Sequence, residues 1–134
     1  MLDKKSLTAF ATSQRSKFEA KLRDLVEIPS VSADPARKDD VRKTAEAGAQ
    51  LIRDFGGEAK VVATDGHPIV FGKFRSGKDS PVVTLYNHLE LQPAWRETEP
   101  WDTDPFRFTT KGDRYFGRGT TDDKGPALTA LWGM

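Results

Sequence analysis

Apolar residues recur at helical spacing near the start of the chain, which predicts an amphipathic helix over residues 16–27. Ser16 and Glu19 stand at the spacing of an N-terminal capping box. Pro29 disfavours helical backbone at the residue before it, so the helix is expected to end before Pro29. The residues on its apolar face are Phe18, Leu22, Leu25 and Val26.

A second helix is predicted over residues 39–55, after a loop at 29–38. Asp39 and Asp40 suit the positive end of its dipole, and Gly56 with Gly57 provides its end. Small residues on its apolar face would allow close packing on a sheet. The apolar face consists of Val41, Ala45, Ala49, Ile52 and Phe55.

Three stretches favour β-structure. Residues 59–64 and 69–75 are predicted to be strands joined by a polar turn, and residues 106–110 and 114–116 are predicted to form a second hairpin. Residues 81–86 are β-branched and aromatic, without helical periodicity. We expect them to form a strand buried on both faces inside a parallel sheet.

A third helix is predicted to start near Pro126, because proline suits the first helical position. Leu128, Leu131 and Trp132 on this helix need a partner surface. We expect them to leave an apolar patch exposed, and the protein to be marginally stable or self-associated. The long loop at residues 91–105 is expected to pack through its two tryptophans.

Composition narrows the classes of function. The chain has 21 basic and 20 acidic residues and a net charge of +1, which predicts neither a nucleic acid nor a membrane as partner. It has no cysteine, so any metal must be held by nitrogen and oxygen donors. No segment suits a signal peptide or a bilayer span, so a cytoplasmic location is the default expectation.

His88 and Glu90 follow residues 81–86, at the end of the predicted strand where open α/β sheets bind ligands. Extended backbone would place both side chains on the same side. A metal-ligating imidazole needs an acceptor for its other ring nitrogen, and Glu90 could supply it directly or orient a carboxylate that does. The alternative is that His88 is satisfied by backbone and Glu90 is solvated.

Asp122 and Asp123 directly precede the helix near Pro126. The positive end of the helix dipole keeps adjacent carboxylates ionised and favours them as cation ligands. One carboxylate can bridge two metal ions, which lie about 3.5–4 Å apart in two-metal hydrolases. The alternative is that the two aspartates only stabilise the helix N-terminus.

Taken together, these clusters and their neighbours closely resemble the M20 family of dinuclear zinc peptidases, in its branch of carnosinase-like dipeptidases. The matching runs are residues 86–94, 101–106 and 112–126, with earlier landmarks at 28–35 and 66–68. The resemblance covers nearly the whole chain. It implies an α/β fold, a three-layer α/β/α arrangement with a largely parallel mixed sheet, of which these residues are the N-terminal portion.

The resemblance also implies roles for individual residues. His88 matches the first zinc-ligating histidine, and Asp122 matches the carboxylate that bridges two Zn²⁺ ions, with a cis peptide bond between Asp122 and Asp123. Glu90 takes the place of an aspartate that supports the histidine, and we assign it this catalytic support. Its extra methylene requires the carboxylate to fold back or the loop to shift. Asn87 stands where glycine is usual.

The family's general-base glutamate and its other metal ligands lie downstream of the Asp pair. The resemblance therefore implies that residues 1–134 are an incomplete catalytic domain, without its second half or the dimerisation domain, and inactive alone. The intact protein is expected to be a homodimer that cleaves a dipeptide or related amide through a metal-bridging water. The alternatives are a non-catalytic binding or regulatory relative that kept the fold, and a deacylase of N-acyl amino acids.

Overall fold

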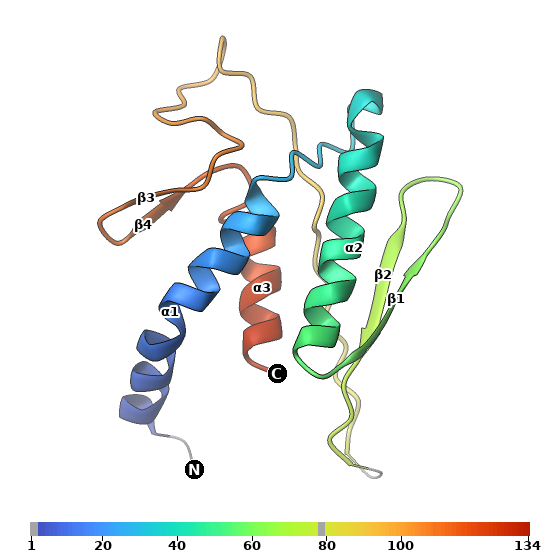
Figure 1. The fold of residues 1–134 in the computed structure, drawn as a ribbon, viewed down its shortest axis with the longest axis vertical. Helices are drawn as coiled ribbons and strands as arrows, with labels where there is room; N and C mark the ends of the chain where they lie inside the picture. The colour runs from blue at the N-terminus through green and yellow to red at the C-terminus, as the bar shows by residue number, and fades with distance from the viewer. Residues whose placement is uncertain (1–2, 78–79) are drawn as a thin grey trace.

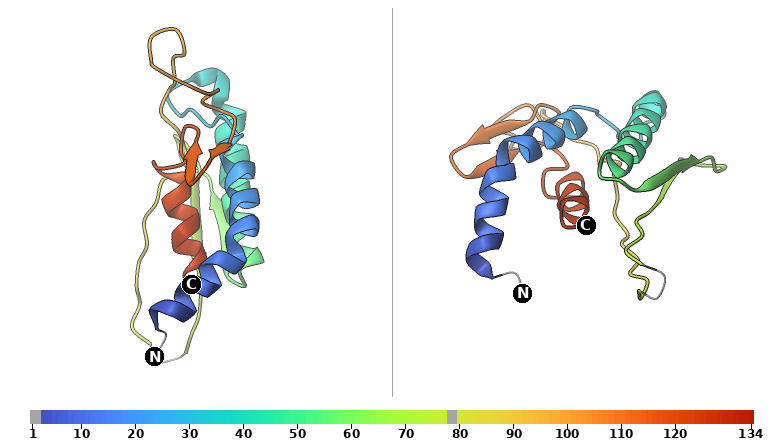
Figure 2. Two further views of the ribbon diagram at one scale, coloured as in Figure 1. Left: turned by 90° about the vertical axis from the view of Figure 1, so that its left-hand side faces the viewer. Right: turned by 60° about the horizontal axis from the view of Figure 1, so that its bottom comes forward.

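Three helices and two β-hairpins make up the part of the chain that the computed structural model describes, residues 3–77 and 80–134. The helices are α1 (Lys4–Val26), α2 (Lys38–Asp54) and α3 (Lys124–Trp132), and a short 3-10 helix, η1 (Pro35–Arg37), precedes α2. Figure 1 shows α3 between α1 and α2, with one hairpin beyond each outer helix, and Figure 2 gives two further views of this arrangement.

Helix α1 begins earlier than predicted. Asp3 is its N-cap, and the Asp3 carboxylate accepts a hydrogen bond of 2.8 Å from the backbone N–H of Ser6. The predicted capping box is wrong, because Ser16 lies inside the helix. Glu19 does not reach back to Ser16, since its carboxylate accepts hydrogen bonds from Arg15 at 2.8 Å and from the Tyr115 hydroxyl at 3.0 Å.

Helix α2 matches its predicted bounds within one residue at each end. Its buried residues are Val41, Thr44, Ala45, Gly48, Ala49 and Leu51. Gly56 follows with a φ of 86°, the left-handed conformation that glycine supplies at a helix end. Among the described residues, no helix has the length and apolar character that crossing a membrane requires.

Both predicted hairpins are confirmed. Strands β1 (Glu58–Val62) and β2 (Ile69–Lys73) pair antiparallel, and so do β3 (Thr109–Lys111) and β4 (Arg114–Phe116). Helix α2 packs on β1 and β2, and a Cβ placed at Gly72 would lie 2.6 Å from the Ile52 side chain. The mixture of helices and strands agrees with the predicted α/β class.

The predicted buried strand at residues 81–86 is wrong for the described part of the chain. These residues form no strand, and the side chains of Val82 and Val83 are 92% and 78% exposed. A strand buried on both faces needs a hydrogen-bonded neighbour on each side, and no described segment pairs with this one. The parallel pairing seen in the described residues is a single bridge between Val31 and Leu91.

The core lies where α1, α2, α3 and the loop before β3 meet. Leu128 of α3 is fully buried, and the Trp132 ring packs edge-on against the rings of Phe18 and Phe55, at centroid distances of 5.5 and 5.0 Å. The buried core residues are Leu22, Leu25, Val26, Leu51, Phe108 and Leu128. Helix α3 therefore does have a partner surface, contrary to our expectation.

Exposed apolar side chains gather elsewhere. Ile69 and Phe71 lie on β2 and are 58% and 56% exposed, and the segment at 82–86 adds Val82, Val83 and Tyr86. The exposed apolar side chains that we expected on α3 thus lie on β2 and at residues 82–86. Marginal stability and self-association remain predictions.

Candidate metal centre

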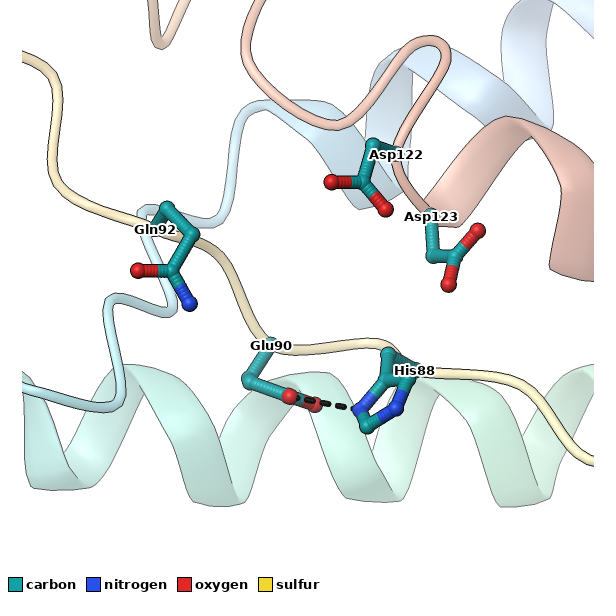
Figure 3. Close-up of a pocket in the computed structure, with 5 residues that line it drawn as sticks. All are labelled: His88, Glu90, Gln92, Asp122 and Asp123. Atoms are coloured by element: carbon teal, nitrogen blue, oxygen red, sulfur yellow. Dashed lines mark hydrogen bonds and ion pairs between the residues drawn. The ribbon is translucent and has the colours of Figure 1, made fainter.

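His88 and Glu90 form a pair on the chain segment that runs past α2. The Nδ1 atom of His88 lies 2.7 Å from Oε1 of Glu90, as the dashed line in Figure 3 marks. This contact agrees with the prediction that Glu90 supports His88 directly, and the longer glutamate arm does reach the ring. A carboxylate that accepts the Nδ1 proton leaves the Nε2 lone pair for a metal ion.

Asp122 and Asp123 lie across from this pair, on the turn that enters α3 (Figure 3). The peptide bond between them is cis, as the resemblance implies. Asp123 is the N-cap residue of α3, yet its side chain makes no capping hydrogen bond. The alternative, that this carboxylate serves to cap the helix, is therefore not supported for Asp123.

The four side chains, together with Gln92, line one open cavity of about 220 Å³. Gln92 is a residue that our sequence reasoning missed. The signal for it was the same period of two that connects His88 with Glu90, since alternate residues of an extended segment share a side. Three carboxylates and an imidazole in one cavity make a site that attracts cations.

The donor types fit zinc, and their number fits only part of a zinc site. Imidazole nitrogen and carboxylate oxygen are ordinary zinc ligands, and a catalytic zinc ion takes three protein ligands. In residues 3–77 and 80–134 no cluster of three or more histidine, aspartate or glutamate side chains has the geometry to hold a metal ion. Further ligands would have to complete the coordination.

A buried lysine follows the two aspartates. Lys124 is fully buried, and its ammonium donates hydrogen bonds to the backbone carbonyls of Leu25 at 2.7 Å and Ile28 at 2.8 Å. Burial lowers the pKa of Lys124 to about 7, against the opposing effect of the negative charge of Asp40. Sequence reasoning did not single out Lys124, because its partners lie about a hundred residues away along the chain.

The long loop at residues 91–105 packs through Trp101, as predicted, but not through Trp95, whose side chain is 60% exposed. The indole N–H of Trp101 donates to Glu99 at 2.6 Å, and this hydrogen bond holds the pKa of the Glu99 carboxyl below its usual value. Arg118 stacks over the Trp101 ring at 5.0 Å and donates to the carbonyl of Pro93 at 2.9 Å. The loop is thereby tied to the chain that leads into Asp122.

His67, the other histidine, lies outside the cavity. Its Nε2 atom is 3.0 Å from the backbone oxygen of Ser32, in the loop that follows α1.

The fold defines the class: it is that of the M20 metallopeptidases, and the chain's homologues include metallodipeptidases. The α/β fold class predicted from the sequence is thereby confirmed. A solved M20 family metallo-carboxypeptidase from Sulfolobus solfataricus superposes with a TM-score of 0.73 at 28% identity, over 83% of this chain and 24% of the other. No family model matches the chain.

Particular relatives narrow the class. The Cys-Gly metallodipeptidase dug1 of Schizosaccharomyces pombe is 35% identical over 127 residues, which are 86% of this chain and 26% of the relative. The β-Ala-His dipeptidase of Rattus norvegicus is 31% identical over 114 residues, 77% of this chain and 23% of the relative. Human carnosine dipeptidase 1 superposes with a TM-score of 0.84 at 26% identity, over 92% of this chain and 28% of that structure. The chain thus spans about a quarter of the length of the curated relatives it matches.

Proposed function

We propose that the intact protein is a zinc-dependent dipeptidase of the M20 type, and that this chain supplies one side of its metal centre. His88 and Asp122 are the metal ligands, and Glu90 holds His88. The observation that carries the proposal is the 2.7 Å contact between Nδ1 of His88 and Glu90, with Asp122 and Asp123 facing the pair across the same cavity.

Each residue has a definite task in this scheme. Glu90 fixes the tautomer of His88 and raises the basicity of the opposite ring nitrogen. Asp122 presents two carboxylate oxygens, which suits it to bridge two ions. Zinc bound there would polarise the scissile carbonyl and lower the pKa of a water molecule. The cavity is open, so an extended dipeptide can approach these groups from solvent.

Several predictions from the sequence accompany the proposal and rest on the family resemblance. They are a pair of zinc ions, a homodimer, a cytoplasmic location, and residues 1–134 as an incomplete catalytic domain that is inactive alone. The relatives' names favour peptide substrates such as Cys-Gly and β-Ala-His. An N-acyl amino acid remains the alternative substrate, because it contains an amide bond that the same metal chemistry could cleave.

The test uses the native protein as purified from its source, measured for zinc content and for hydrolysis of Cys-Gly, β-Ala-His and an N-acetyl amino acid. We expect bound zinc and cleavage of at least one dipeptide. The substitution His88→Ala should lower zinc content and kcat/KM by at least about a hundredfold, because a metal ligand is lost.

The control is Asp65→Ala, which removes an exposed carboxylate outside the cavity and should leave both zinc content and kcat/KM unchanged. Equal losses in the two variants would show that His88 acts through the fold rather than through metal. A native protein that binds the dipeptide, binds no zinc and does not cleave the dipeptide would favour the non-catalytic relative instead.

A further inference from the structure

The two sides of the candidate metal centre come from distant parts of the chain and meet the same short connector. We call His88 with Glu90 the histidine half, Asp122 with Asp123 the aspartate half, and residues 25–32 the connector. The connector leads from the end of α1 toward η1. Both halves are hydrogen-bonded to it, so its shape bears directly on their separation.

The aspartate half is attached through Lys124, the residue directly after Asp123. Its ammonium bonds the carbonyls of Leu25 and Ile28, at 2.7 and 2.8 Å, and no part of the side chain reaches solvent. These carbonyls belong to the last turn of α1 and the residues after it. The Leu25 carbonyl also accepts from the Ile28 N–H at 3.2 Å, and the Ile28 carbonyl from the Ser30 N–H at 2.8 Å, so the lysine bonds to a turn that is itself hydrogen-bonded. A buried donor in this position leaves the turn little freedom to move along α1.

The histidine half is attached through Ser30, which is also fully buried. The Ser30 hydroxyl donates to the carbonyl of Leu89 at 3.2 Å, and the Ser30 carbonyl accepts from the N–H of Leu91 at 2.8 Å. The N–H of Ser32 donates to the carbonyl of Leu91 at 3.3 Å. Glu90 is thus held between two residues that are both bonded to the connector.

The two attachments also touch each other through Gly119. A Cβ at Gly119 would lie 2.6 Å from the Leu91 side chain and 3.3 Å from the Lys124 side chain. Gly119 therefore lets a residue beside the histidine half and a residue beside the aspartate half approach closely. Any side chain at this position would push the two halves apart.

We propose that the connector, through the buried anchors Lys124 and Ser30, sets the separation of the histidine and aspartate halves. Both anchors are positioning residues, since neither lines the cavity. The part of the proposal that concerns metal affinity rests on the proposed function. The part that concerns attachment can be measured without metal.

The test compares Lys124→Met, which keeps the length and apolar stem of the side chain but removes its donor, with Leu128→Ala as a control. Leu128 is equally buried on α3 and belongs to the same core as Leu25 and Val26, but its side chain makes no hydrogen bond to the connector. Its truncation therefore removes packing while it leaves both anchors in place. Ser30→Ala is the second, milder variant, which keeps the proposal open to refutation if Lys124→Met does not fold.

Two readouts are taken on the native protein. In its metal-free form, hydrogen exchange should show the amides of Leu91 and Gly125 exchanging at least about tenfold faster in Lys124→Met, relative to the amides of β1 and β2. Zinc affinity should fall by about 10- to 100-fold, the usual effect of losing a group that orients metal ligands. The control should retain the wild-type zinc affinity under conditions where it is folded.

Unchanged exchange at Leu91 and Gly125 would overturn the proposal, and so would faster exchange with wild-type zinc affinity. If the wild-type protein binds no zinc, the proposed function fails by itself. The exchange experiment then still decides whether Lys124 and Ser30 hold the two halves to the connector. If Lys124→Met does not fold, the Ser30→Ala variant decides by the same two readouts.

Discussion

The turn before α3 should not tolerate a side chain at Gly125. A Cβ placed there would overlap the backbone oxygen of Thr120, so Gly125→Ala requires a backbone shift of more than about 1 Å. Overpacking of this kind costs about 1–3 kcal/mol. The shift also strains the 3.0 Å hydrogen bond from the Gly125 N–H to Gly119, a contribution of about 0.5–1.5 kcal/mol. We expect a total loss of about 2–4 kcal/mol.

Gly133 is the matched control, because it lies just after the same helix and has room. Its nearest neighbour for a Cβ is the Ala130 oxygen at 3.6 Å, so Gly133→Ala should change stability by less than about 0.5 kcal/mol. Urea unfolding followed by circular dichroism gives both free energies of unfolding. Equal stabilities for the two variants would refute the argument, since the close approach at Thr120 would then carry no cost.

Two further predictions concern the core and the pH dependence of stability. Leu128→Ala should lower the free energy of unfolding, measured in urea, by about 2–5 kcal/mol. Leu7→Ala, at a half-exposed position, should lower it by less than about 0.5 kcal/mol. Similar losses in the two variants would contradict the assigned core. Hydrogen bonds from Arg15 and Tyr115 hold the pKa of Glu19 below its usual value. The Glu19 carboxylate therefore stabilises the fold at pH values above about 4.3, the pKa of an unperturbed glutamate. This contribution disappears as the pH falls through the lowered pKa. Acid titration of the wild type and Glu19→Gln should therefore show a stability difference that shrinks with falling pH, and a constant difference would count against this contribution.

Local pattern predicted those elements whose signals are complete within a short window. The apolar face of α2 and the turns of both hairpins depend on neighbouring residues, and all three elements were found. The start of α1 was missed because Ser16 and Glu19, which have the spacing of a capping box, lie inside the helix and not at its N-terminus. The true cap, Asp3, precedes a stretch with little apolar periodicity, so the pattern gave no reason to extend the helix toward it.

The same distinction between local and distant signals applies to the candidate site. The spacing of His88 and Glu90, and the adjacency of Asp122 and Asp123, are visible in the sequence. Lys124 and the connector are not, because Lys124 meets its partners across 96 and 99 residues of chain. In the sequence, a lysine between Asp123 and Gly125 does not differ from a lysine on the surface. Only the fold shows that its ammonium is bonded to the end of α1.

The prediction that His88 and Glu90 lie on the same side agrees with the structure although the strand prediction is wrong, and the reason is physical. The argument that His88 and Glu90 share a side requires extended backbone, and extended backbone does not require a paired sheet. Residues 81–86 lack pairing and burial, yet His88, Glu90 and Gln92 still line one cavity. Sheet formation depends on distant partners, whereas the side on which alternate residues lie is a local property. Two side chains that share a side at this spacing can therefore be predicted from sequence even where the surrounding sheet cannot.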